Sequence, residues 1–305
     1  MWPVTATDSE TTERRYLESI EVTSTIARKL FVVSIAAFVA VVGVGDLAFT
    51  RLGTPVQPVT ITVGSPLEVL FGVAMIVGLL VVVIVPHELL HGVFMARYGG
   101  DPEYGIGVRG LLMPSAYART KGSIYTRNQM LIATLAPLFV LTGGGFALAV
   151  VTGRPLLVVP AAANAAGSVG DLWIAARIRR YPEYVRVAEP PEGYDGDVAV
   201  YGFEDAEQGE PGARPRGVAT WLYGAAGTLT LAVAALFASV IVSLAAGSGD
   251  VALEAPLLDG PLFRHELPAP GRGAVVAVGF PVLFTLSAVG GLVWTVVSRG
   301  RESGS

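Results

Sequence analysis

The 305-residue sequence contains no cysteine, so it can form neither a disulfide bond nor a thiolate metal site. Any metal ion must therefore be held by histidine, aspartate, glutamate or water. Charged residues are scarce, at 15% of the chain, and the formal net charge of -4 argues against a general role in nucleic-acid binding. Hydrophobic residues make up 52% of the sequence, which is too many for an ordinary soluble domain. This composition predicts an integral membrane protein.

Six apolar stretches are each long enough to cross a hydrocarbon core of about 30 Å, which needs roughly 20 helical residues. They cover residues 30–49, 67–95, 130–151, 156–178, 218–246 and 274–297. We therefore expect an all-α integral membrane protein with about six transmembrane helices. The turn sequence TGRP separates the third stretch from the fourth, so these two should form an antiparallel hairpin.

The distribution of arginine and lysine predicts the orientation, because the cytoplasmic loops of membrane proteins retain positive charge. Most of these residues fall before residue 30, in the loops 97–127 and 177–216, and after residue 298. Both termini of this multi-pass cell-membrane protein are therefore expected in the cytoplasm, and the acidic loop 248–272 outside. The first 25 residues lack the apolar core of a secretory signal, which favours a cytosolic lead-in.

These expectations divide the chain into five parts. They are a cytosolic lead-in at 1–29, a four-helix membrane core at 30–178, a cytosolic linker at 179–216, a two-helix membrane hairpin at 217–298 and a cytosolic tail at 299–305. In the loop after the second helix, short β-leaning pieces at 104–108 and 123–126 predict a small cytosolic hairpin.

The second apolar stretch contains the sequence HELLH, in which His87 and His91 are four residues apart. On a helix they lie on one face about one turn apart, so both imidazoles can bind one small cation. Glu88 lies beside the first histidine, where it can take a proton from a water molecule held by the metal. This arrangement is typical of zinc hydrolases, and it predicts one Zn²⁺ ion with Glu88 as the catalytic base of the four-helix core.

Two buried histidines and a buried glutamate without a metal are the alternative interpretation. An ionised group at mid-membrane costs roughly 3 kcal/mol on insertion scales, and packing alone does not offset that cost. The chain has only three histidines, so a chance match to His-Glu-x-x-His is rare. We therefore favour metal binding.

Two histidines and a water leave one protein ligand to be found, and a carboxylate is the expected type. Asp46 and Glu68 lie near the predicted outer ends of the first two helices. His91 precedes Arg97 by six residues and Asp171 precedes Arg177 by six, these being the first arginines toward the cytoplasmic ends of the two stretches. Because equal numbers of helical residues give equal depth, we predict Asp171 as the third ligand. A structural salt bridge or a capping role is the alternative.

Asn164, Ser168 and Asp171 are spaced four and three residues apart, which places them on one face of a continuous helix. Asn164 is a candidate to hydrogen-bond a substrate strand or stabilise an oxyanion, and Ser168 to orient a ligand, although both could equally join helices. Pro86, which precedes His87, removes a helical hydrogen bond and predicts a kink that admits water.

With HELLH on the second helix and NAAGSVGDL on a later one, the chain resembles the intramembrane zinc metalloproteases of the site-2 protease type. It is more closely similar, over roughly residues 65–205, to a family of zincin-type peptidases of unknown function. The resemblance implies that His87, His91 and Asp171 bind zinc and that Glu88 activates water. Site-2 proteases usually carry a proline and the order Leu-Asp-Gly in the second motif, whereas this chain has Gly-Asp-Leu and no proline there.

The sequence thus predicts a zinc-dependent intramembrane metalloendopeptidase that cleaves a membrane protein or peptide near the cytosolic face. The β-leaning segment after Tyr104 could hold a substrate extended as an added strand. One alternative is a membrane metal transporter or sensor, in which the same side chains bind an ion in transit. Another is a proteolytically inactive scaffold that keeps its zinc for folding.

Overall fold

The computed structural model describes residues 14–54, 59–61, 66–109, 113–193, 196–203, 216–246, 251–254, 261–266 and 274–302. Within these ranges, five helices are long and apolar enough to cross a membrane, at Ser24–Arg51, Leu70–Arg97, Arg127–Thr152, Gly217–Val242 and Phe280–Arg299. A sixth span would combine Pro155–Gly167 with Val169–Ile178, which are bent by 42° where they meet. The predicted set of apolar helices is therefore found, with the fourth of them broken.

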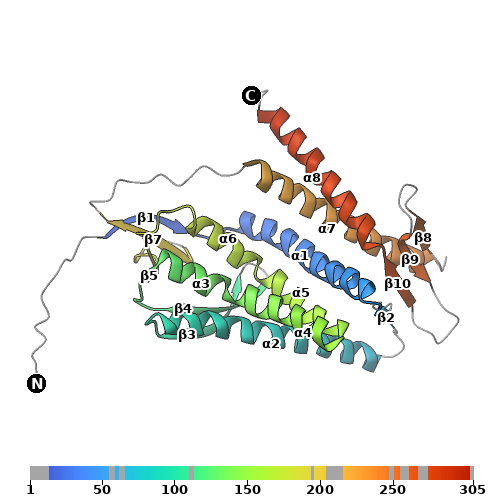
Figure 1. Ribbon diagram of the computed structural model, residues 1–305, viewed down its shortest axis with the longest axis horizontal. Coiled ribbons are helices and arrows are strands. Elements are labelled where there is room, and N and C mark those ends of the chain that lie inside the picture. The colour runs from blue at the N-terminus through green and yellow to red at the C-terminus, as the bar shows by residue number, and fades with distance from the viewer. Residues whose placement is uncertain are drawn as a thin grey trace, which may run out of the picture. The chain divides into compact units, whose positions relative to one another are not determined.

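The helices follow one another along the chain as labelled in Figure 1. They are α1 (Ser24–Arg51), α2 (Pro66–Arg97), α3 (Arg127–Pro137), α4 (Gly144–Thr152), α5 (Val158–Gly167), α6 (Val169–Ile178), α7 (Arg216–Ala246) and α8 (Phe280–Glu302). A π-helical turn, η1 (Leu138–Gly143), joins α3 to α4, and a 3-10 turn, η2 (Pro155–Leu157), leads into α5.

The all-α prediction is wrong in one respect, because ten strands occur in the described ranges. They are β1 (Arg14–Ile20), β2 (Val59–Ile61), β3 (Pro102–Arg109), β4 (Met113–Thr120), β5 (Tyr125–Thr126), β6 (Arg186–Ala188), β7 (Val198–Phe203), β8 (Val251–Glu254), β9 (Pro261–Glu266) and β10 (Ala274–Val278). One sheet has the order β1-β7-β6-β5, a second has β2-β10-β9-β8, and β3 pairs with β4 alone. The last predicted stretch therefore begins as strand β10, and helix α8 starts only at Phe280.

The chain divides into two compact units. The first, here the sheet unit, comprises the described residues of Met1–Thr23, Leu90–Leu135 and Asp171–Ala213. The second, here the helical unit, comprises those of Ser24–Leu89, Ala136–Gly170 and Arg214–Ser305. The five-part division expected from the sequence stays a prediction.

The sheet unit has a core between the antiparallel sheet β1-β7-β6-β5 and the ends of three helices. In β6 the side chain of Val187 is buried while its two neighbours are half-buried, as the alternation of a strand requires. The buried members of this core are Ile20, Met95, Tyr125, Met130, Ala133, Ile178, Tyr181, Val185, Val187, Val198 and Val200. This core holds the C-terminal end of α2 beside α3 and α6.

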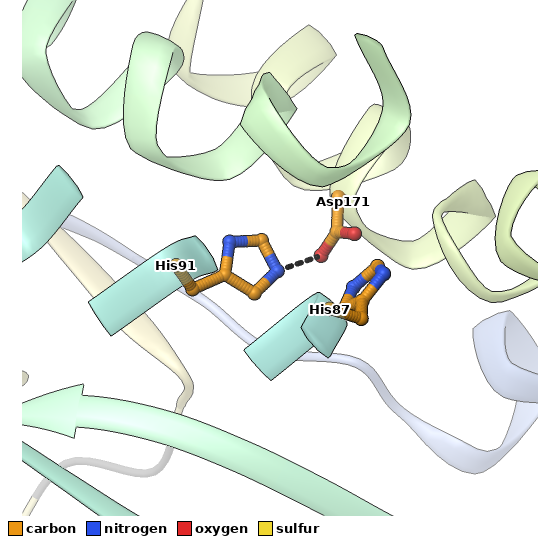
Figure 2. Close-up of side chains that lie close together, drawn as sticks. All are labelled: His87, His91 and Asp171. Atoms are coloured by element: carbon orange, nitrogen blue, oxygen red, sulfur yellow. Dashed lines mark ion pairs between the residues drawn. The ribbon is translucent and has the colours of Figure 1, made fainter. Parts of the chain in front are cut away.

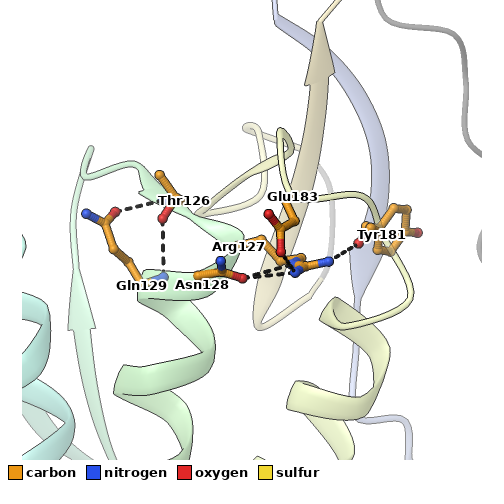
Figure 3. A network of polar contacts seen from close by, with 6 residues as sticks. All are labelled: Thr126, Arg127, Asn128, Gln129, Tyr181 and Glu183. Carbon is orange, nitrogen blue, oxygen red and sulfur yellow. Dashed lines mark hydrogen bonds and ion pairs between the residues drawn. The ribbon is translucent and has the colours of Figure 1, made fainter.

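Helix α3 begins with a capping box (Figure 3). The Gln129 N–H donates to Thr126 Oγ1 at 3.2 Å, and the Thr126 N–H donates to Gln129 Oε1 at 2.9 Å. Arg127 then donates to the carbonyl of Tyr181 and to the Glu183 carboxylate, both at 2.8 Å. The start of α3 is thereby tied to the segment that follows α6.

The hairpin predicted after the second helix is present, with the predicted piece 104–108 inside its first strand but with a different second strand. Residues 102–109 pair with residues 113–120, from Pro102 opposite Thr120 to Arg109 opposite Met113. The chain then turns at Gly122, whose φ of 65° suits a glycine, and leaves the hairpin. The predicted piece 123–126 therefore supplies β5, which pairs with β6 rather than with β3.

The helical unit is built from close helix contacts. At Gly45 of α1, an added Cβ atom would lie 2.6 Å from Cγ1 of Val158 on α5, so the two helices meet where glycine leaves room. Ser34 Oγ donates to the carbonyl of Ala166 at 2.8 Å along the same contact. Helices α7 and α8 lie side by side, and Trp221 Nε1 donates across them to the carbonyl of Ala288 at 3.1 Å.

Candidate metal centre

His91 lies on the part of α2 that belongs to the sheet unit, and 8% of its surface is exposed. Its Nδ1 lies 2.9 Å from the carbonyl oxygen of Ala133 on α3. Because a carbonyl can only accept, Nδ1 carries the proton and Nε2 keeps its lone pair. That Nε2 lies 3.6 Å from Oδ1 of Asp171, which confirms the predicted proximity of these two residues.

His87 lies one turn earlier on α2, within the helical unit, and is equally buried. Its Nδ1 lies 2.9 Å from Oδ1 of Asn164 on α5. The side-chain nitrogen of Asn164 donates to the carbonyl of Pro137 and to Thr142 Oγ1, both at 2.9 Å, which assigns Oδ1 as the acceptor. His87 therefore also carries its proton on Nδ1, and its Nε2 is the nitrogen with a lone pair.

The side chains of His87, His91 and Asp171 converge in Figure 2, and one ligand atom from each lies within 4.8 Å of the others. Two imidazole nitrogens and a carboxylate oxygen are the donor set of many catalytic zinc sites, with the fourth position open to water. Metal-binding histidines usually donate their second ring N–H to a carbonyl or carboxylate, as both rings do here to oxygen acceptors. The residues present therefore fit a zinc ion.

Asp171 lies in the first turn of α6. Residues 156–178 were expected to form one helix, and this is wrong, because α5 ends at Gly167 and α6 begins at Val169, so Asn164 and Asp171 belong to different helices. The break has a local cause, because glycine lies immediately before Ser168 and two residues after it. The break therefore places the Asp171 side chain at the start of a new helix.

The remaining predicted site residues lie on α2, on α5 and at the break between α5 and α6. Glu88 follows His87 on α2 and is half-buried. Ser168 is fully buried, at 0% exposure, and its hydroxyl has no hydrogen-bond partner among the described residues. Asn164, at 1% exposure, contacts His87 directly. The roles of Glu88 as base, of Ser168 in orienting a ligand and of Asn164 toward substrate stay predictions.

The kink predicted at Pro86 stays a prediction. Helix α2 runs without a break from Pro66 to Arg97, with Pro86 inside it. An irregularity lies after Pro137, where the chain forms the π-helical turn η1, and π-helical turns are frequent at functional sites. The carbonyl of Pro137 and the hydroxyl of Thr142 in this turn are the two acceptors for Asn164.

Three contributors to the centre were missed from the sequence. Thr142 could have been noticed as a hydroxyl residue inside an apolar stretch, where such groups usually face another helix. The carbonyls of Ala133 and Pro137 carry no sequence signal, because every residue has a carbonyl and only tertiary packing selects the one that accepts.

One comparison with known proteins gives a match. A family model described as "Putative zincin peptidase" matches residues 80–186. This range includes HELLH, the Asn164 contact and the first turn of α6. No curated protein and no solved structure matches the chain. The match supports a metallopeptidase of the zincin type and zinc as its metal, in agreement with the donor set of the three side chains.

Proposed function

We propose that this protein is a zinc-dependent metalloendopeptidase that cleaves a membrane protein or peptide within the bilayer, near its cytosolic face. The observation that carries the proposal is the convergence of His87, His91 and Asp171, with the Nδ1 of each histidine engaged by an oxygen atom. Glu88, next to His87 in the sequence, supplies the base that hydrolysis needs.

The chain's own residues have defined tasks in this reaction. Zinc, when bound by the three side chains, would polarise the scissile carbonyl and lower the pKa of water toward neutrality. Glu88 accepts a proton from the attacking water as its oxygen bonds to the carbonyl carbon. As the carbon–nitrogen bond breaks, Glu88 gives that proton to the leaving amine. Asn164 and the Ala133 carbonyl keep both imidazoles in the orientation that presents Nε2.

The sheets support the membrane orientation expected from the positive charges. Strands β1, β5, β6 and β7 come from segments expected inside. Strands β2, β8 and β9 come from segments expected outside, and β10 forms the outer end of the last predicted span. In the described ranges, neither four-stranded sheet mixes the two sets. Since a sheet cannot form across a bilayer, this segregation agrees with the predicted division of the loops into two sets, and the positive charges assign the cytoplasmic set.

The β3–β4 hairpin is suited to hold an extended substrate. At Gly92, directly after His91, an added Cβ atom would lie 2.0 Å from the hydroxyl of Tyr104, so β3 approaches α2 beside the metal ligand. The two strands pair with each other alone in the described part of the chain. An added substrate strand would gain main-chain hydrogen bonds there and expose the carbonyl that a helical substrate conceals.

A transporter is less well supported. The described residues contain a single group of three or more possible metal ligands, the one formed by His87, His91 and Asp171. A permeation path needs further polar stations across the membrane. A transporter also has no use for a carboxylate that abstracts a proton from water.

The test is cleavage of membrane-reconstituted peptides by the Glu88→Gln variant, compared with the unaltered protein at equal zinc content. We expect activity to fall by at least about 100-fold, because a general base contributes 10²–10⁴-fold, while zinc binding persists. Glu192→Gln, which alters an exposed carboxylate outside the hairpin, is the matched control and should retain activity. Equal activity of the Glu88→Gln variant would refute the proposed role of Glu88.

A further inference from the structure

The helical unit contains a cavity of about 190 Å³. Its walls come from Val82 and Val83 on α2, Gly145 and Leu148 on α4, and Ala161 and Asn164 on α5. The other lining side chains are apolar as well. The glycine and the alanine make room here, since a Cβ atom added at Gly145 would come within 3.4 Å of Cβ of Ala161.

The cavity lies close to His87. Val83 precedes His87 by four residues and shares its helix face, and Ala161 precedes Asn164 by three on α5. The cavity therefore begins at Asn164 and extends about one helical turn, roughly 5 Å, away from the hydrogen bond between His87 and Asn164. Consecutive residues of an extended chain are spaced about 3.3 Å apart, so this distance corresponds to one or two residues of a substrate strand.

The lining determines what the cavity can hold. Both side-chain N–H donors of Asn164 are engaged, by Pro137 and Thr142, and its Oδ1 accepts from His87. The other lining residues offer no polar side chain. An apolar cavity of about 150 Å³ holds benzene, so this one has room for a leucine or phenylalanine side chain.

The rim shows from which side such a group would come. Val82 and Leu148 are 65% and 53% exposed, and both belong to the apolar helical surface that would face lipid. A ligand that comes from the aqueous phase would have to cross that apolar surface. A side chain of a membrane-embedded segment is already next to it.

We propose that this cavity is the specificity pocket of the enzyme. It receives an apolar side chain, of leucine to phenylalanine size, from a membrane-embedded substrate at one or two residues from the scissile bond. This inference rests on the proposed peptidase function. It adds the substrate class: transmembrane segments with a bulky apolar residue beside the cleavage position.

The test fills the cavity and measures binding rather than turnover. Gly145→Leu places a side chain in the cavity, whereas Gly144→Leu, one residue earlier, meets nothing within 4 Å and is the matched control. The zinc-loaded proteins would be titrated with acetohydroxamate and with its isobutyl and benzyl homologues. The hydroxamate head binds zinc, and the added group probes the pocket. The unaltered protein and the two variants are measured in the same detergent, so partition of the probes into detergent affects all three measurements equally.

For the unaltered protein and for Gly144→Leu, affinity should rise about fourfold for each added methylene group that is buried. In Gly145→Leu, acetohydroxamate should bind as before and the gain from the larger groups should disappear. Unchanged gains in Gly145→Leu, or no gain in the unaltered protein, would overturn the pocket while leaving the metal site intact. Failure of acetohydroxamate to bind the zinc-loaded protein would instead overturn the proposed function and the pocket together.

A lipid acyl chain has the same chemistry as an apolar side chain, so its presence must be tested separately. Native mass spectrometry of the unaltered protein and both variants measures retained lipid. We expect the same lipid content in Gly145→Leu and in Gly144→Leu. A lipid lost only from Gly145→Leu would assign the cavity to lipid and overturn the inference. Among transmembrane peptides that differ at one position, Gly145→Leu should shift the preferred residue from leucine or phenylalanine to alanine.

Discussion

Nδ1 of His87 donates a hydrogen bond to Oδ1 of Asn164, on a helix 77 residues further along the chain, at 2.9 Å. Asn164 is in turn held by two acceptors in the π-helical turn region, so it cannot rotate its amide without losing both. The orientation of one predicted zinc ligand thus depends on a residue that does not need to touch the metal.

Replacing Asn164 by alanine should weaken zinc binding by about 10- to 100-fold, as is typical for loss of a partner behind a metal-bound histidine. Competition with a chelator of known affinity measures the change. Asn128→Ala, which removes an exposed amide at the start of α3, serves as the control and should bind zinc normally. Equal zinc affinity in both variants would show that the Asn164 contact does not orient His87.

Asp171→Asn should abolish stoichiometric zinc binding, because a neutral amide is a poor substitute for an anionic ligand. Metal analysis of the purified protein should find one zinc ion per chain in the unaltered protein and in the exposed-site control Asp101→Asn, and much less in Asp171→Asn. Zinc should also raise the thermal midpoint of the unaltered protein, since a ligand that binds the folded state stabilises it. Full zinc occupancy in Asp171→Asn would exclude Asp171 as a ligand.

Gly291→Ala should destabilise the pair of helices α7 and α8 by about 1–3 kcal/mol. A Cβ atom at Gly291 would lie 2.7 Å from the carbonyl oxygen of Trp221, a backbone atom that cannot move aside without displacing its helix. Gly227→Ala on α7 meets nothing within 4 Å and should be close to neutral. Unfolding in mild detergent with increasing denaturant measures both variants, and similar stabilities would contradict the close approach.

Tyr181 should make stability fall at high pH. Burial raises the pKa of its hydroxyl above 10.0, against the opposing effect of the Arg177 and Arg180 charges. The folded protein then holds this proton more tightly than the unfolded chain does. Ionisation of Tyr181 therefore does not change the free energy of unfolding below pH 10.0. As the pH rises from 10.0 through the pKa of the folded state, ionisation lowers the free energy of unfolding. Tyr181→Phe should show a shallower loss over that range, and identical pH profiles would contradict the prediction.

The parts of the site that the sequence predicts are those tied to membrane depth and helical period. His91 and Asp171 could be paired because each lies six residues before an arginine that marks a helix end. Hydropathy did not predict the helix break at Ser168, because the residues on both sides of it are similarly apolar. The glycines around Ser168 were the sequence signal for a break.

The strands were harder to predict than the helices for two physical reasons. Most are short, and several pair segments far apart in the chain, as when Arg14 of β1 faces Phe203 of β7. A strand that completes a sheet by such a distant pairing has no strong local pattern of its own. In the last apolar stretch, residues 274–278 are apolar enough to continue a helix, and their pairing with β9 and β2 decides against it.

The pairing of β1 with β7 also has a consequence for biosynthesis. As the chain leaves the ribosome, β1 emerges early but has to wait for residues 198–203 before its partner strand exists. His87, His91 and Asp171 have all been synthesised by then, yet the sheet unit that holds His91 and Asp171 is still missing one of its sheet's inner strands. A nascent chain therefore contains all three candidate metal ligands before the sheet that supports two of them is complete, and that sheet cannot be completed until residue 203, about two thirds of the way along the chain, has been made.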